Sequence, residues 1–305
     1  RIDTSLGYSF NANTLSGDIV FSYAFGPLRP ALHVFQKVDF EDYVSPRLAG
    51  GDLQLAPEER FVSRWRGIEP RVSVEPLPNT RVSASFGITD VFKGSLSRQE
   101  VIDEGINLLP QIALSYDGMR AVDPDRMLRF SGISGRTALR QRFRDDLRRP
   151  VLLETENRVV AQYNPSPRWS IEEHLSVDSM IRVWERDLVE PYQLGGYSGI
   201  RGYRASEIRA VRVAMLAQTV SRQVLPELEL EVPIGRKQRA TLHQYRLFLV
   251  NELAVTQEDL AVDSPLSFYG SIGGGLGMTV SLRWIHLDLS ATLVNASAAE
   301  ERPVF

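Results

Sequence analysis

The strongest constraint on this chain is the alternation of apolar with small or polar residues along segments of ten or more positions. From Ile272 to Trp284, every second residue is apolar or glycine, and the positions between them carry glycine, serine, threonine or arginine. A period of two is that of a β-strand, whose side chains point to opposite faces. Strands of soluble proteins usually have about five or six residues, whereas a strand that crosses a bilayer needs about 9–11. The pattern therefore predicts an all-β fold with strands long enough to span a membrane.

The same alternation divides the whole chain into strands and connections. Several connections are short turns, and long ones are expected at 41–65, 93–107, 137–150 and 179–210. Short turns at one end and long loops at the other are typical of outer-membrane barrels, so we predict a transmembrane antiparallel β-barrel of about 14–16 strands. The predicted strands are 4–11, 15–25, 30–40, 66–76, 80–92, 108–118, 125–136, 151–163, 167–178, 211–234 (one strand or two), 242–255, 268–280 and 283–293.

Composition and motif content exclude several classes of function. The chain contains no cysteine, which rules out disulfides and thiolate metal sites. A formal net charge of −3 provides no basic face, so no nucleic-acid partner is expected. The histidines, His33, His174, His243 and His286, lack the spacing of a metal site, and we expect neither a metal nor a cofactor. No set of nucleophile, base and orienting group can be assembled, so we expect no enzymatic activity.

One segment, Arg140 to Arg149, is strongly basic and falls in a predicted connection. Such a segment can contact anionic lipid headgroups or lipopolysaccharide. It can also be a solvated loop of mixed charge, which is the interpretation that we favour.

A glycine-rich loop that carries one arginine follows the predicted strand 167–178. Residues 195–203 read Gly-Gly-Tyr-Ser-Gly-Ile-Arg-Gly-Tyr. Glycines permit positive φ and close backbone approach, and the guanidinium of Arg201 can hold two acceptors at once. By alternation, Glu229 and Glu252 fall on the face of their strands opposite the leucines. They are either acceptors for Arg201 or ordinary charges that face water in the interior.

The segment 195–203 resembles the (V/I)-R-G-(F/Y) loop of the BamA superfamily of outer-membrane barrels. Segments 228–234, 248–255 and 271–276 resemble three strands that follow this loop in the family. The resemblance implies that the loop folds back into the barrel lumen and that Arg201 pairs there with Glu229 and Glu252. The matching loop positions are Gly195, Gly196, Ser198, Ile200, Arg201, Gly202 and Tyr203.

This resemblance also implies a function without catalytic chemistry. We expect a barrel in the outer membrane of a Gram-negative-type bacterium that inserts or translocates proteins there. Its expected partners are outer-membrane lipid and lipopolysaccharide, together with protein clients or other envelope subunits.

We expect residues 1–305 to form a single barrel domain that contains no POTRA domain and lacks the last strand of the barrel. The alternative function is a structural or pore-forming barrel without POTRA domains that acts as an anchor or subunit of an envelope complex. A soluble β-sandwich would instead require that the apolar faces converge on one core.

Overall fold

Most described residues of the chain lie in β-strands. The computed structural model describes residues 2–9, 14–42, 46–49, 52–55, 60–93, 105–122, 128, 130–185, 189, 191–195, 200–203, 208–225, 228–234, 239–260, 264–282 and 285–297. No helix among them is long and apolar enough to cross a membrane.

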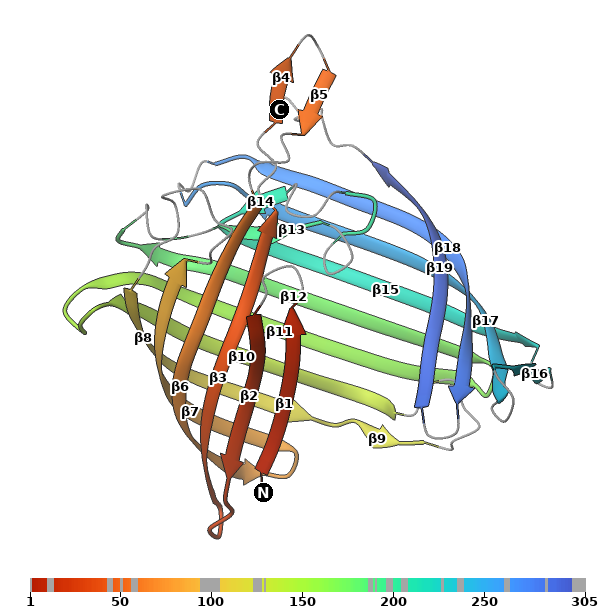
Figure 1. The fold of residues 1–305 in the computed structure, drawn as a ribbon, viewed down its shortest axis with the longest axis horizontal. Coiled ribbons are helices and arrows are strands. Elements are labelled where there is room, and N and C mark those ends of the chain that lie inside the picture. Colours follow the sequence, from red (N-terminus) through yellow and green to blue (C-terminus); the bar gives the residue numbers. More distant parts are fainter. Residues whose placement is uncertain are drawn as a thin grey trace.

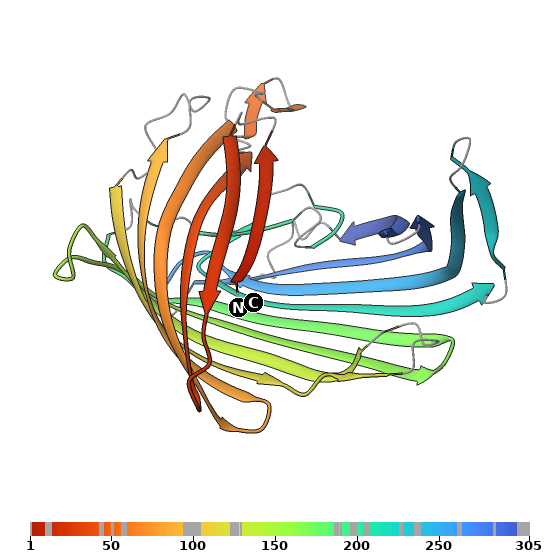
Figure 2. The ribbon, with the colours of Figure 1, turned by 60° about the horizontal axis from the view of Figure 1, so that its bottom comes forward.

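Most strands belong to one 15-stranded antiparallel sheet, which begins at β1 and ends at β19. Figures 1 and 2 show this sheet curling around a central space. The strands along the sheet are β1 (Ile2–Ser9), β2 (Thr14–Ser22), β3 (Leu28–Asp42), β6 (Arg60–Leu77), β7 (Thr80–Lys93), β8 (Gly105–Asp117), β10 (Phe130–Arg144), β11 (Pro150–Ser166), β12 (Trp169–Val183), β15 (Arg212–Leu225), β17 (Arg239–Gln257), β18 (Leu266–Leu282) and β19 (Ile285–Ser297).

Six shorter strands complete the fold. Two of them extend the large sheet, because β9 pairs with β10 and β16 pairs with β17. The other four form two separate hairpins, β4–β5 and β13–β14. Their bounds are β4 (Pro46–Ala49), β5 (Asp52–Leu55), β9 (Arg120–Ala121), β13 (Tyr192–Leu194), β14 (Ile208–Ala210) and β16 (Leu230–Pro233).

The strands agree with the predicted segments in order, and two predicted connections are corrected. The segment 211–234, predicted as one strand or two, is two strands, β15 and β16. The region 137–150 is not a long connection, because β10 continues to Arg144 and β11 begins at Pro150. The region 41–65 contains the hairpin β4–β5 and the first residues of β6.

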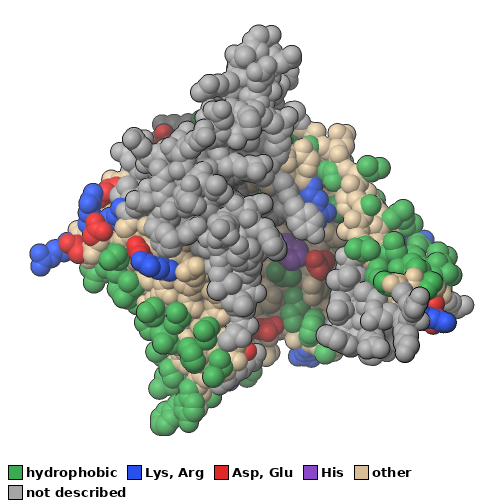
Figure 3. All heavy atoms as spheres, viewed as in Figure 1, with side chains coloured by type: hydrophobic (Ala, Val, Ile, Leu, Met, Phe, Trp, Pro, Cys, Tyr) green, Lys and Arg blue, Asp and Glu red, His purple; other side chains and the backbone are tan. Residues whose placement is uncertain are grey.

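Apolar side chains lie on the outside of the sheet rather than in one internal core. On β8, Ile112 is 61% exposed and its neighbour Ala113 is 5% exposed; on β17, Leu249 is 66% exposed and Val250 is 2% exposed. In Figure 3 hydrophobic side chains cover the lower flank of the sheet, whereas charged and histidine side chains lie in the hollow at its centre. A soluble sandwich would bury the leucine face, so that alternative is wrong. The outer face is the apolar surface that a transmembrane barrel presents to lipid.

Glycines on the inner face of β18 make room for side chains of neighbouring strands. A Cβ on Gly275 would lie 2.1 Å from the carbonyl oxygen of Ala291 and 2.6 Å from Cζ of Phe248. The adjacent Gly274 points outward, where a Cβ would lie 3.3 Å from Cδ2 of Leu249. Only the inward position therefore requires glycine for steric reasons.

We predict that Gly275→Val destabilises the barrel much more than Gly274→Val does. The inward valine overlaps Phe248 and the β19 backbone, and such overpacking typically costs about 1–3 kcal/mol. Urea unfolding of the protein in detergent, followed by the heat-modifiable shift on gels, measures the difference. Equal losses of stability in the two variants would contradict the assignment of inner and outer faces.

Candidate functional site

The loop between β12 and β15 is held at its base by a two-stranded ribbon. Strands β13 and β14 pair from Tyr192↔Ala210 to Leu194↔Ile208, and the described residues between them, 195 and 200–203, belong to the tip of the loop. Gly195 and Gly202 have φ of 115° and 91°, a region that favours glycine. Of the motif positions, Gly196 and Ser198 lie outside the described residues. The remaining positions place the tip against the inner wall of the sheet.

A buried carboxylate on the wall binds the tip. Glu252 of β17 is 2% exposed. Its Oε2 accepts hydrogen bonds from the backbone N–H of Arg201 at 2.6 Å and from Oγ of Ser271 on β18 at 2.9 Å. Its Oε1 lies 3.3 Å from Nε of Arg201. A carboxylate buried in this way needs charge pairing and hydrogen bonds, and these groups from the loop and from β18 supply them.

Ile200, the residue before the arginine, anchors the tip by apolar contact. It is fully buried and forms a cluster with Ile208 of β14 and Ala254 of β17. Burial of an isoleucine side chain is worth about 1.5–3 kcal/mol. The cluster therefore fixes the position of the backbone from which Arg201 extends. The partly buried side chains around the cluster are Leu194, Tyr203, Met215 and Tyr269.

The tip also contacts β19, the last strand of the sheet. The hydroxyl of Tyr203 donates a hydrogen bond to the backbone carbonyl of Ser297. The Tyr203 ring meets Tyr269 of β18 edge to face, with ring centroids 5.6 Å apart. A Cβ on Gly202 would lie 2.7 Å from Cβ of Ala296. The tip therefore touches three neighbouring strands, β17, β18 and β19.

A second polar contact ties the base of the loop to β11, the strand that pairs with β12. The Tyr192 hydroxyl donates to Oε2 of Glu154 on β11 at 3.3 Å, and burial together with the charge of Glu154 raises the pKa of this phenol. Nη1 of Arg140 donates to Oε1 of the same carboxylate at 3.2 Å, and its Nε donates to Gln111 at 2.9 Å. The phenol is thus kept protonated as a donor.

The position of Arg140 corrects our interpretation of the basic segment 140–149. Arg140 lies within β10 and bonds to residues of the neighbouring strands β8 and β11, so it belongs neither to a solvated loop nor to a lipid contact. At the other end of the segment, Arg149 is exposed and pairs with Glu185 at 2.7 Å. The sequence did not predict the pairing of Arg140, because a polar lumen and a solvated loop both accept arginine and leave the same polar pattern.

The structure places Glu229 far from Arg201, so the expected pairing of these two residues is not met. Glu229 is exposed and precedes β16, whose first residue, Leu230, pairs with Leu242 of β17. Leu242 lies ten residues before Glu252 on the same strand. At about 3.3 Å per residue, this separation is roughly 30 Å. Alternation carries no information about the height of Glu229 along the wall.

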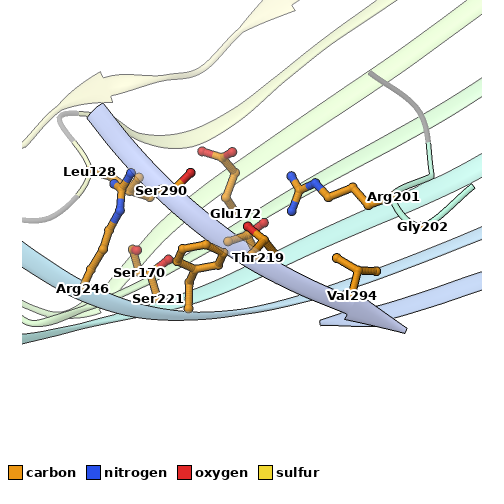
Figure 4. A pocket seen from close by; sticks show the side chains of 12 residues that line it. Leu128, Ser170, Glu172, Arg201, Gly202, Thr219, Ser221, Arg246, Ser290 and Val294 are labelled. Atoms are coloured by element: carbon orange, nitrogen blue, oxygen red, sulfur yellow. The ribbon is translucent and has the colours of Figure 1, made fainter. Parts of the chain in front are cut away.

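A polar cavity adjoins the loop tip on the inner side of the sheet. Its volume is about 620 Å³, and Figure 4 shows Arg201, Glu172 and Arg246 among the side chains that line it. Serine and threonine side chains of β12, β15 and β19 complete much of the lining. Within the described ranges, no group of three or more histidine, aspartate or glutamate side chains could hold a metal ion. The described lining of the cavity is polar.

Comparisons with known proteins identify the fold. No family model matches the chain, and no curated protein matches it. Among solved structures, the chain is similar to BamA from Haemophilus ducreyi lacking POTRA domains 1–3, with a TM-score of 0.51 and 12% identity. The likeness covers 97% of this chain and 70% of that chain. The chain therefore has the fold of a BamA-type barrel, and at this identity the likeness concerns the fold alone.

We predict that Gly202→Ala loosens the contact between the loop tip and β19. The new Cβ overlaps Ala296, and alanine at φ of 91° is strained. Ala296→Gly removes the overlap but not the strain, so the double variant should be more stable than the sum of the two single effects predicts. Urea unfolding in detergent measures all three variants, and strictly additive losses would show that Gly202 and Ala296 do not touch.

Proposed function

We propose that this chain is an outer-membrane barrel of the BamA superfamily that inserts or translocates proteins at the outer membrane. The observation that carries the proposal is the arginine loop bound inside the barrel. There Arg201 forms an ion pair with Glu252, and Tyr203 donates a hydrogen bond to Ser297 of β19. The BamA-type fold supports it. The site consists of Gly195, Gly196, Ser198, Ile200, Arg201, Gly202 and Tyr203 with Glu252 as the acidic partner.

The physical basis of the proposed activity is an exchangeable strand edge. An edge strand offers backbone donors and acceptors to an incoming strand, and in lipid an unpaired edge is costly. The sheet runs from β1 to β19, and the loop tip contacts β17, β18 and β19 at one end of it. The loop would keep these three strands together while the edge beyond β19 exchanges partners. The protein would need no catalytic residue for this task.

The proposed location is the bacterial outer membrane. There the apolar outer face would contact lipid, and the rim of the barrel would contact lipopolysaccharide. Client proteins or other envelope subunits would be the protein partners.

One observation favours a second candidate function, that of a passive pore or anchor. The interior contains a polar cavity of about 620 Å³ beside Arg201. A polar lumen can conduct water and ions if the loop leaves a continuous path.

We predict that the protein in proteoliposomes accelerates the folding of a urea-denatured outer-membrane barrel, relative to protein-free liposomes. Arg201→Ala should lose most of the acceleration, because the loop no longer holds the wall. A loss of roughly tenfold corresponds to about 1.4 kcal/mol. Protease resistance of the client over time measures its folding rate. Glu229→Ala is the matched control and should retain the activity, since Glu229 lies far from the loop.

The same vesicles distinguish the two candidates. Ion conductance across the membrane without any acceleration of client folding would contradict the insertion proposal and favour the pore.

A further inference from the structure

Three polar side chains form a row on three neighbouring strands. Glu173 of β12 pairs in register with Gln218 of β15, and Gln218 pairs with Asn251 of β17. Nε2 of Gln218 donates to Oε1 of Glu173 at 2.6 Å. In the described part of the chain, this is the only hydrogen bond between side chains of the row. We call Glu173, Gln218 and Asn251 the polar row.

The polar row lies on the outer face of the barrel. Side chains two positions from the row on the same strand lie on the same face. On one side of the row these are Leu175, Leu216 and Leu253, which pair in register and are exposed. On the other side, Leu249 of β17 is also exposed. The residues between them point inward, where Thr219 lines the cavity and Glu252 binds the loop. Alternation therefore directs the polar row toward lipid.

The row is inside the apolar band rather than at its margin. Trp169 begins β12 and stacks with Arg222 of β15, with the guanidinium carbon 5.4 Å from the ring centroid. An aromatic residue with an arginine is typical of the membrane interface. Glu173 comes four residues later on the strand. With a rise of about 3.3 Å per residue and a strand tilt of about 40°, it lies roughly 10 Å deeper, within a band about 25 Å tall.

A carboxylate and two amides at this depth are unfavourable when they face hydrocarbon. Intramembrane ionisable residues are costly, and they ordinarily face protein partners or water. The amides have more donors and acceptors than the single bond from Gln218 to Glu173 uses. A protein surface with complementary groups at the same depth would satisfy them.

We infer that the outer face of β12, β15 and β17 is the interface between two copies of this chain in the membrane. A two-fold axis parallel to the membrane normal keeps every residue at its own depth, so it brings a polar row opposite a polar row. With β15 facing β15, Gln218 meets Gln218 of the second copy. The order of the strands is reversed across the axis, so the Glu173 side of one copy faces the Asn251 side of the other.

The chemistry of the row suits this arrangement. It carries one acceptor group, the carboxylate, and two amides that both donate and accept, so it is complementary to itself. The exposed leucines that flank the row, Leu175, Leu216, Leu249 and Leu253, supply apolar packing around it. Hydrogen bonds between polar side chains stabilise contacts between proteins in membranes.

The absence of cysteine from the sequence makes the inference directly testable. We would replace Gln218 by cysteine, reconstitute the folded protein in lipid vesicles and oxidise it with copper phenanthroline. The matched control is Ile112→Cys on the outer face of β8, which is also exposed and lies outside the row. The heat-modifiable gel shift of each variant shows that it is folded before oxidation.

We expect most of Gln218→Cys to run at twice the monomer mass and Ile112→Cys to remain monomeric. Adding Asn251→Leu to Gln218→Cys should reduce the cross-linked fraction several-fold, because the second copy loses a hydrogen-bonding partner. Failure of Gln218→Cys to cross-link, or equal cross-linking at both positions, would overturn the inference. Cross-linking of Gln218→Cys only to a different protein in native membranes would also overturn it, because the row would then serve another partner.

Discussion

The buried carboxylate of Glu252 is the constraint on which the arrangement of the lumen depends. A charge at 2% exposure is stable only if neighbouring groups replace water, and Arg201 and Ser271 do so from the loop and from β18. The loop therefore cannot leave the wall without exposing an unpaired charge. Ile200 and Tyr203 on either side of Arg201 extend this contact, so one ion pair positions a tip that reaches β17, β18 and β19.

The two faces of the sheet lie in opposite environments, lipid outside and a polar lumen inside. The outer face carries apolar side chains because it contacts lipid. The inner face carries small or polar side chains because the interior is crowded. Gly275, for example, leaves room for the ring of Phe248. The polar row of Glu173, Gln218 and Asn251 departs from this rule on the outer face. Polar groups at this depth are costly when they face hydrocarbon, and a neighbouring protein surface with polar groups would satisfy them.

Much of the fold could be predicted from the sequence because strand period and strand length are local properties. Residues 137–150 were mistaken for a connection because a polar lumen permits charged residues, such as Arg140, within a strand. Alternation gave the face of Glu252, but only the register of β16 with β17 shows that Glu229 lies roughly 30 Å from it. The loop motif identified Arg201 as a candidate site residue. The hydrogen bond from Tyr203 to Ser297 joins residues 94 positions apart, so no local sequence pattern could predict it.

The most direct test of the account is a double-mutant cycle of Arg201→Ala and Glu252→Ala, measured by urea unfolding of the barrel in detergent. If the loop is braced inside the lumen, the two single losses are not additive, and the coupling free energy is at least about 1 kcal/mol. The same cycle with Glu229→Ala in place of Glu252→Ala should show no coupling. Additive losses for Arg201 and Glu252, within about 0.5 kcal/mol, would contradict the account, because the loop would then not depend on the buried carboxylate.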